Sequence, residues 1–318
     1  MKSDNLYIGI DLGGTAVKIG LVSEQGELIN HQQIVTRREM SYLTVISDII
    51  ETSQSIVQQI DFDWGKIKGI GMGIPGLIDL ENGVVKFAPN LNWVDVPIKE
   101  IFEEKLNIPF KIDNDANLAA LGESWTGAGK GHKHIVMATL GTGIGSGIII
   151  DGKILHGKSG MAAELGHIPI SNEKIQCGCG SFDCLETVSS ATGIKRKGEE
   201  VVRSRKISLL TERFADNLDK LSAKDVIDAA KDGDKEALNI INNAGKLLGR
   251  GLAVAADLLD PEIIIIGGGL SLAGDIIFNP IRKEFYKTGL DNIVKNINIV
   301  PAILGNKAGM TGGAALFT

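Results

Sequence analysis

Cysteine is scarce in this sequence, and the positions of the few cysteines are its most informative feature. The 318 residues contain three, Cys177, Cys179 and Cys184, and all lie in one short, glycine-rich segment. Three cysteines cannot all pair within one chain, and a bridge between Cys177 and Cys179 would be strained. A disulfide framework is therefore excluded, and the thiols remain either metal ligands or free, reduced groups.

Long apolar stretches and an excess of basic residues are also missing. The longest run without a charged residue, 135–150, is rich in glycine and falls short of the roughly 20 apolar residues of a membrane span. A net charge of −6 argues against nucleic acid as the main partner. Residues 1–5 resemble neither a secretion signal nor a transit segment. We expect a cytoplasmic protein that binds neither membrane nor nucleic acid.

Hydrophobic residues make up 43% of the chain, so it can bury a sizeable core, and its length suits two domains. An apolar strand at 6–11, a glycine turn and a strand at 16–22 begin a β-meander. The same pattern returns more than a hundred residues later and predicts a duplicated α/β fold. Further strands are expected at 67–74, 134–140, 146–150, 153–156, 262–266 and 297–304, and helices at 41–60, 223–231, 234–259, 279–288 and 307–317.

Three glycine turns stand at the ends of apolar strands and predict a site for a nucleotide triphosphate. Glycine lets backbone N–H groups surround an anion, and threonine hydroxyls add donors. Asp11 is placed to hold Mg²⁺ through water. The candidate nucleotide-binding residues are Asp11, Gly13, Gly14, Thr15 and Lys18 at the first turn, Thr142 and Gly143 at the second, and Gly267, Gly268 and Gly269 at the third.

Two other glycine motifs are rejected. Residues 152–159 match the phosphate-loop pattern G-x-x-x-x-G-K-[ST], but their interior is bulky and they follow a hairpin turn rather than a strand that leads into a helix. Residues 71–76 match G-x-G-x-x-G, but Pro75 and the polar turn beyond it are not the helix that a dinucleotide fold requires.

The three cysteines and His167 form a complete ligand set for zinc. Three thiolates and one imidazole can close a tetrahedral site, which is typical of a structural metal. The alternative is a reduced, metal-free loop. Glu164 and Glu186 flank the cluster and would be held in place by the metal for another purpose.

A second polar cluster lies at residues 113–117, where a strand ends and a helix begins. An ordinary helix cap needs one asparagine or aspartate, and this segment contains four: Asp113, Asn114, Asp115 and Asn117. The surplus favours a functional site at the end of the strand.

These motifs together resemble the ROK family of sugar kinases, and most closely its bacterial glucokinases. The resemblance covers nearly the whole chain and depends on residues 11–15, 73–76, 114–117, 140–143, 164–167 and 177–186. It implies a duplicated actin-like, RNase H-like ATPase fold with the active site in the cleft between two lobes. The implied lobes are residues 1–114, on which a terminal helix near 305–318 packs, and residues 115–304, which carry the zinc loop.

The resemblance also implies a role for each matched position. Asp115 would be the general base, and Gly76, Asn114, Glu164, His167 and Glu186 would bind the sugar. His167 would serve zinc with one ring nitrogen and the sugar with the other. The sequence departs from the usual glycine of the family at Ala163 and Asp183. Aspartate tolerates left-handed backbone better than most residues, so we expect the loop to survive.

The expected activity is transfer of the γ-phosphoryl group of ATP to a hexose, most closely D-glucose, with Mg²⁺ accompanying ATP and zinc as a structural ion. The expected assembly is a homodimer or homotetramer. Kinases of N-acetylmannosamine or another hexose share the same motifs and remain open. A sugar-sensing repressor would carry an additional helix-turn-helix before the first strand, and only about five residues precede it here. A chaperone-like ATPase would need neither Asp115 nor the zinc loop.

Overall fold

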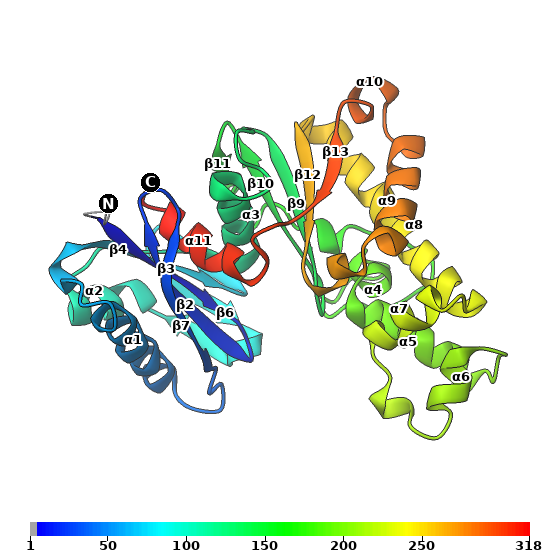
Figure 1. Cartoon of the computed structure of the whole chain (residues 1–318), viewed down its shortest axis with the longest axis horizontal. Coiled ribbons are helices and arrows are strands. Elements are labelled where there is room, and N and C mark those ends of the chain that lie inside the picture. The colour runs from blue at the N-terminus through cyan, green and yellow to red at the C-terminus, as the bar shows by residue number, and fades with distance from the viewer. Residues whose placement is uncertain (1–4) are drawn as a thin grey trace. The chain divides into compact units, whose positions relative to one another are not determined.

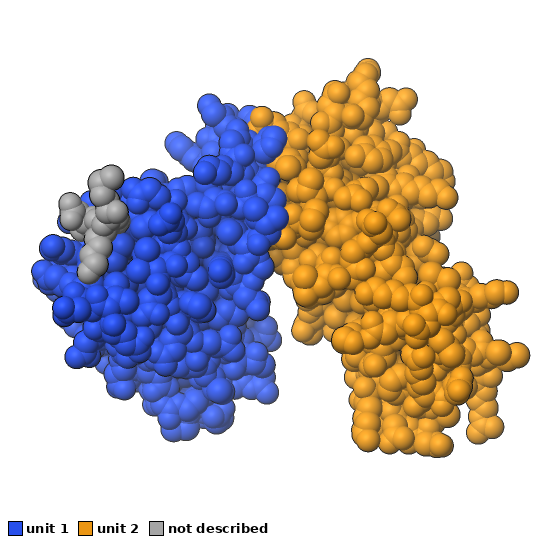
Figure 2. Space-filling model, in the orientation of Figure 1, with its two compact units in different colours: residues 1–135, 147–163, 303–318 blue, residues 136–146, 164–302 orange. Residues whose placement is uncertain are grey.

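The computed structural model describes residues 5–318 (Figure 1), and these form two compact units, shown in different colours in Figure 2. The first contains the described residues up to Ile135 together with Gly147–Ala163 and Ile303–Thr318. The second contains Val136–Ser146 and Glu164–Ala302. The chain therefore passes from one unit to the other after Ile135, Ser146, Ala163 and Ala302.

A five-stranded sheet forms the centre of the first unit, with the strand order β3-β2-β1-β4-β8. The first three strands are an antiparallel meander, and β4 and β8 run parallel to β1. A small antiparallel sheet, β5-β6-β7, accompanies it. The strands are β1 (Leu6–Leu12), β2 (Ala16–Ser23), β3 (Leu28–Val35), β4 (Ile67–Ile74), β5 (Leu77–Asp79), β6 (Val84–Ala88), β7 (Trp93–Val96) and β8 (Phe110–Asn114).

Glycines on two strands allow the C-terminal helix α11 (Ala308–Ala315) to lie directly on this sheet. A Cβ at Gly9 would stand 1.7 Å from the carbonyl oxygen of Met310, and one at Gly71 would stand 1.9 Å from that of Gly313. Any side chain on either strand residue would push the helix away. The glycines of β1 and β4 are therefore packing positions, and they explain why a helix of small residues ends the chain.

The opposite face of the sheet packs on α1 (Tyr42–Gln58). Ile8 and Ile10 alternate with Gly9 along β1, so they point away from α11, and both are fully buried. They belong to one hydrophobic cluster with Ile46 and Ile49 of α1. Ser41 caps this helix, because its Oγ accepts the N–H of Thr44 at 3.2 Å. The other helices of the unit are α2 (Ile98–Leu106) and α3 (Asp115–Thr126).

A second five-stranded sheet has the order β11-β10-β9-β12-β13. Its strands are β9 (Ile135–Leu140), β10 (Ile144–Ile150), β11 (Lys153–Ile154), β12 (Ile263–Gly267) and β13 (Asn298–Pro301). Strands β9, β10 and β11 repeat the order of β1, β2 and β3, and the two later strands again lie on the other side of the first. The predicted duplication and α/β class are confirmed by this repeated topology.

Helices make up most of the second unit. Two of them, α8 (Lys235–Leu259) and α9 (Asp275–Thr288), pack closely, since a Cβ at Gly249 would stand 2.5 Å from the carbonyl oxygen of Ile281. The others are α4 (Glu186–Ser189), α5 (Ala191–Arg203), α6 (Leu209–Phe214), α7 (Ala223–Lys231) and α10 (Asp291–Val294). Within residues 5–318, no helix combines the length and apolar character needed to cross a membrane.

Several elements differ from the sequence-based prediction. The helix expected at 279–288 begins four residues earlier and contains Pro280, whose ring packs so closely on Gly245 that a Cβ there would stand 2.7 Å from it. The strands expected at 153–156 and 297–304 are shorter. Helix α3 packs against α11 and therefore belongs to the first compact unit, although the predicted lobe boundary precedes it. The lobes at 1–114 and 115–304 stay a prediction.

Candidate functional site

The turn between β8 and α3 in the first unit holds the predicted base. Asn114 is the N-cap of α3, since its Oδ1 accepts the N–H groups of Ala116 at 2.9 Å and Asn117 at 3.3 Å. Asp115 is the first residue of the helix and is half-buried, with its Oδ1 2.9 Å from the N–H of Ala116. Of the four polar residues noted in the sequence, Asn114 alone is the helix cap, and the side chains of the other three make different contacts.

The fourth polar residue of this turn, Asp113, is buried and supports the cap. Its Oδ1 accepts the backbone N–H of Asn114 at 2.7 Å and the side-chain amide of Asn117 at 2.9 Å. Its Oδ2 lies 2.6 Å from Nε2 of His156, a residue 43 positions away that the sequence analysis did not identify. The hydrogen bond to this carboxylate raises the pKa of His156 and outweighs the opposing effect of burial. No local pattern could have revealed the pair, because the fold alone brings the two residues together.

The first glycine turn joins β1 to β2 and is held from both sides. The N–H of Gly13 donates to the carbonyl of Ala16 at 3.0 Å, and the hydroxyl of Thr36 donates to the carbonyl of Gly13 at 2.7 Å. A Cβ at Gly14 would meet Asn90 only at an ordinary contact distance of 3.4 Å. Packing alone therefore does not require glycine at position 14, and its role in binding phosphate stays a prediction.

The predicted magnesium-holding residue, Asp11, has a cationic neighbour in the same turn. Its Oδ2 lies 2.9 Å from Nζ of Lys18, and both side chains are half-buried. Gly309, at the start of α11, approaches Asp11 so closely that a Cβ there would stand 2.9 Å from the carboxylate carbon. The structure thus brings Asp11 and Lys18 together beside the turn.

Gly76 lies between β4 and β5 and cannot be replaced without strain. Its φ of +117° lies in a region that favours glycine, and a Cβ would stand 2.3 Å from the carbonyl oxygen of Phe87. Close packing on the small sheet is sufficient reason for this glycine. Its predicted contact with the sugar stays a prediction.

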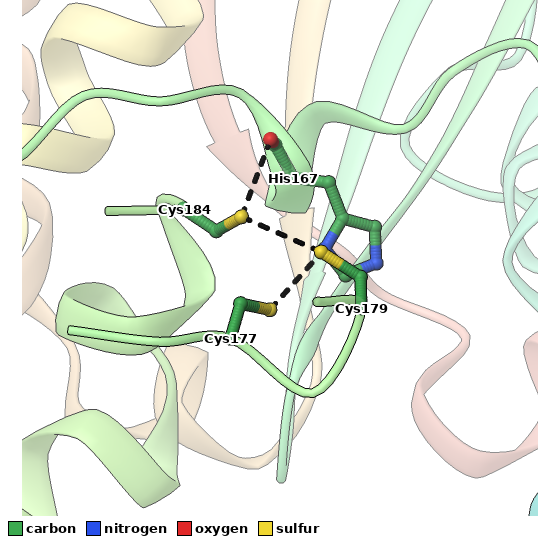
Figure 3. A group of neighbouring side chains, drawn as sticks. All are labelled: His167, Cys177, Cys179 and Cys184. Carbon is green, nitrogen blue, oxygen red and sulfur yellow. Dashed lines mark hydrogen bonds between the residues drawn. The ribbon is translucent and has the colours of Figure 1, made fainter. Parts of the chain in front are cut away.

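In the second unit, the four predicted metal ligands converge (Figure 3). One ligand atom from each of His167, Cys177, Cys179 and Cys184 lies within 4.8 Å of all the others. Sγ of Cys179 and Sγ of Cys184 are 3.7 Å apart, and Sγ of Cys177 is 3.6 Å from Nδ1 of His167. A tetrahedron with zinc–sulfur bonds of about 2.3 Å and a zinc–nitrogen bond of about 2.0 Å has edges of about 3.8 Å between sulfurs and about 3.5 Å between sulfur and nitrogen. The donor set therefore fits zinc in both chemistry and spacing.

The three thiols differ in their ease of ionisation. The backbone N–H of Ser181 lowers the pKa of the exposed Cys179 to about 7, whereas burial raises the pKa of Cys177 and of Cys184. Metal ligation requires thiolates, so binding of zinc would release the remaining protons. The cluster is thus expected to bind metal less tightly as the pH falls.

Left-handed backbone shapes the loop that carries the cysteines. Asp183 has a φ of +61°, and its Oδ1 accepts the hydroxyl of Ser171 at 2.9 Å and the N–H of Ile175 at 3.2 Å. These hydrogen bonds lower the pKa of Asp183 although burial opposes them. Ala163 also has a positive φ, +68°. Asp183 and Ala163, which replace the usual glycines, therefore both adopt left-handed backbone. For Asp183 this agrees with the expectation that aspartate tolerates this conformation.

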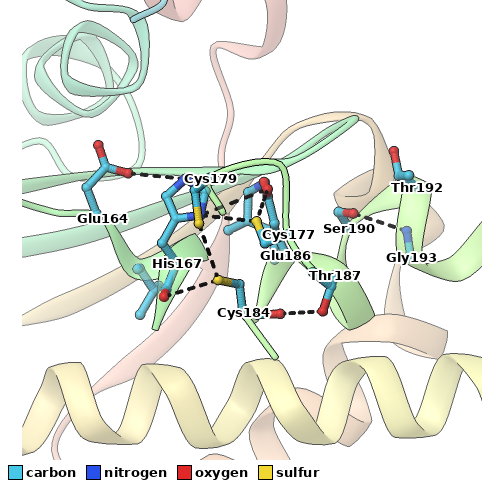
Figure 4. Close-up of polar contacts among 12 residues, drawn as sticks. Glu164, His167, Cys177, Cys179, Cys184, Glu186, Thr187, Ser190, Thr192 and Gly193 are labelled. Carbon is cyan, nitrogen blue, oxygen red and sulfur yellow. Dashed lines mark hydrogen bonds and ion pairs between the residues drawn. The ribbon is translucent and has the colours of Figure 1, made fainter. Parts of the chain in front are cut away.

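Two carboxylates adjoin this cluster (Figure 4). Oε2 of Glu164 lies 3.8 Å from Nε2 of His167, while Nδ1 of the same ring faces the thiols. Oε1 of Glu186 lies 3.1 Å from Sγ of Cys177 and 3.9 Å from Nδ1 of His167. Nδ1 of His167 therefore faces the cysteines and Nε2 faces Glu164, and the dual role of the ring stays a prediction.

The second and third glycine turns lie next to each other in the second unit. Gly268 has a φ of +83°, and a Cβ there would stand 2.4 Å from the carbonyl oxygen of Leu140, where β9 ends. The N–H of Ile144 donates to Oε2 of Glu186 at 3.2 Å. Thr192, which the sequence analysis did not identify, donates its hydroxyl to the carbonyl of Thr142 at 2.8 Å. Glu186 therefore connects the cysteine loop to the second turn.

Comparison with known proteins identifies the family. A model described as "ROK family" matches residues 7–318, nearly the whole chain. The chain belongs to the ROK family. The chain is 40% identical to a glucokinase of Halalkalibacterium halodurans, over 99% of this chain and 95% of that protein. It is 39% identical to a glucokinase of Thermotoga maritima, over 97% and 96%.

The similar proteins also include a solved enzyme complex and a repressor. A ROK family glucokinase from Streptomyces griseus, solved with glucose and AMPPNP, superposes with a TM-score of 0.81 at 33% identity, over 98% of this chain and 99% of that one. A xylose repressor of Caldicellulosiruptor bescii is 33% identical over 99% of this chain and 78% of the repressor. The resemblance inferred from the motifs is confirmed.

Proposed function

We propose that this ROK protein is a glucokinase that transfers the γ-phosphoryl group of ATP to D-glucose and forms glucose 6-phosphate and ADP. The observation that carries the proposal is identity of 39–40% to two glucokinases over 97–99% of the chain. The complex of a similar enzyme with glucose and AMPPNP supports glucose and ATP as the substrates.

In this proposal Asp115 accepts the proton of the sugar 6-hydroxyl while that oxygen attacks the γ-phosphorus and ADP leaves. The position of Asp115 supports this role, because it is the first residue of a capped helix and its Oδ1 lies 2.9 Å from the N–H of Ala116. Asn114, Glu164, His167 and Glu186 hold sugar hydroxyls, and Gly76 contacts the sugar through its backbone. Alignment and charge neutralisation supply most of the catalysis in phosphoryl transfer, so these contacts would act chiefly by positioning.

The glycine turns would bind the phosphates, and the ions would support the two substrates separately. Asp11 would hold Mg²⁺ through water, and the ion would neutralise charge on the triphosphate. His167, Cys177, Cys179 and Cys184 would hold a zinc ion that closes the loop between Glu164 and Glu186. A cytoplasmic location, a homodimer or homotetramer, and movement of two lobes at 1–114 and 115–304 belong to the same proposal.

A coupled assay across sugars and donors tests the proposal directly. Glucose, mannose, N-acetylmannosamine and xylose would be compared at equal concentrations, with ATP and with polyphosphate as donors. We expect the highest kcat/KM with glucose and ATP. A tenfold preference for another hexose would assign a different kinase of the same family.

A sugar-sensing regulator is the second candidate, because of the similarity to the xylose repressor. Binding of a sugar without any phosphoryl transfer in this assay would favour it.

Valine at Gly14 tests the phosphate site. We expect Gly14→Val to weaken ATP binding by at least about tenfold, or ~1.4 kcal/mol, because the side chain would occupy space that the phosphates need. Glucose binding should stay unchanged, since a Cβ at Gly14 meets only Asn90, at an ordinary contact distance of 3.4 Å. Gly143→Val is the contrasting variant, because its Cβ would stand 2.4 Å from Oε2 of Glu186 and should disturb both substrates. Calorimetric titration with each substrate measures both effects, and unchanged ATP affinity in both variants would contradict the two-turn site.

A further inference from the structure

The buried carboxylate of Asp113 has no part in the proposed chemistry, yet it adjoins the proposed base. Charged groups taken out of water need partners that replace their hydration. The two N–H groups that reach Oδ1, those of the Asn114 backbone and the Asn117 side chain, flank Asp115 in the sequence. The orientation of this one carboxylate therefore affects the turn on both sides of the base.

His156 meets the other oxygen of that carboxylate. Nε2 of His156 stands 2.6 Å from Oδ2, and because an ionised carboxylate can only accept, this contact selects the form of the ring that is protonated at Nε2. Only 3% of the Asp113 side chain is exposed, against 36% of the imidazole. Without the imidazole, Oδ2 would lose its partner among the described residues at a place where little water reaches.

The backbone around His156 is itself well held. The N–H of the preceding Leu155 donates to the carbonyl of Ile148 in β10 at 2.8 Å. The carbonyl of His156 accepts the N–H of Ala162 at 3.1 Å and so closes the loop that leads towards Glu164. Hydrogen bonds therefore fix the backbone on both sides of the imidazole, and a side chain that positions another group needs such a fixed backbone.

We propose that His156 is a positioning residue for phosphoryl transfer: it holds the Asp113 carboxylate and, through it, the turn that presents Asp115. The inference rests on the proposed function, with Asp115 as the base. A misplacement of about 1 Å remote from the reacting atoms can cost a factor of about 10² in rate. Alignment matters more in the transition state than in the bound substrate, so turnover should suffer more than binding.

Two substitutions at His156 separate the effect of losing its N–H donor from the effect of changing its size. His156→Phe keeps a ring of similar size but removes the N–H, and we expect kcat to fall about 10- to 100-fold while KM for glucose changes less than about threefold. His156→Gln restores an N–H donor and should recover most of kcat. The matched control is His134→Phe, which breaks a second histidine–aspartate pair of the same unit, 3.5 Å long, whose partner Asp151 is 81% exposed. It should change kcat less than about twofold.

A double-mutant cycle with Asp113→Asn completes the test. If His156 acts through Asp113, adding His156→Phe to Asp113→Asn should cost little more than the more severe single change. Three outcomes would overturn the positioning role. The losses of kcat could be additive in the double variant, or kcat of His156→Phe could lie within twofold of the wild type. In the third, the loss of kcat in the two single variants and the double variant only parallels their loss of thermal stability. If the wild type phosphorylates no hexose, the proposed function and this role both fail. If the wild type is active and the variants give one of the outcomes above, only the positioning role fails, so the two failures are distinguishable.

Discussion

Asp115→Asn should leave glucose binding nearly unchanged and lower kcat by about 10²–10⁴-fold, the usual cost of removing a general base. Asparagine has almost the same shape as aspartate, and its Oδ1 can still accept the N–H of Ala116. The cap made by Asn114 and the support from Asp113 do not involve the Asp115 side chain. The substitution therefore removes the proton acceptor and keeps the turn.

Steady-state kinetics and calorimetric titration with glucose together check this expectation. Asp63→Asn is the matched control, since Oδ1 of Asp63 also accepts a backbone N–H, that of Gly65 at 2.9 Å, in the same unit. It should retain full activity. If Asp115→Asn keeps more than about half of the wild-type kcat, Asp115 is not the base.

Loss of one zinc ligand should have the second large effect. We expect one zinc ion per chain, and we expect Cys184→Ser to lose both the zinc and most of the glucose affinity. Cys184 is fully buried, and its Sγ lies 3.7 Å from that of Cys179, so serine fits the space without supplying a thiolate. Zinc binding is coupled to folding of the loop, so some thermal stability should be lost as well.

The structure also predicts which substrate affinity falls when a zinc ligand is lost. Glu186 lies beside Cys177 and accepts the N–H of Ile144 next to the second glycine turn. Loosening the loop should therefore lower glucose affinity strongly and ATP affinity only slightly, because the first glycine turn in the other unit is unaffected.

Elemental analysis, paired with titrations of both substrates, measures these effects. Gln176→Ala is the control, since it changes an exposed residue of the same loop and keeps all four ligands. A protein that is metal-free as isolated and fully active with chelator would contradict the zinc site. Equal loss of glucose and ATP binding would show that zinc supports the whole fold rather than the sugar site.

Features that depend on neighbouring residues could be predicted from the sequence. Ser41 and Asn114 cap helices within three residues of themselves, so their side chains indicated where α1 and α3 begin. Helix α7 matched its predicted range, because its apolar period is regular and Ser222 and Asp225 form a capping box at its start. The convergence of the four predicted metal ligands was also foreseeable, since the three cysteines lie within eight residues of one another.

Other elements were invisible because their residues lack the expected pattern. Strand β3 is half polar and mostly exposed at the edge of its sheet, and its apolar residues stand in pairs at its two ends, so it has no apolar alternation that could reveal it. The small sheet β5-β6-β7 consists of strands of three to five residues, too short for a periodic signal. Such elements form because a neighbouring strand supplies their hydrogen bonds.

The sequence by itself determined the ROK family, the repeated strand–turn–strand pattern and the set of four predicted metal ligands, because these depend on residue types at short spacings. Only the tertiary structure placed His156 against Asp113, Glu186 against the N–H of Ile144, and α11 against Gly9 and Gly71. These contacts join residues more than forty positions apart, so they depend on strand register and on close packing. A shift of one residue along a strand would turn each side chain to the opposite face of its sheet.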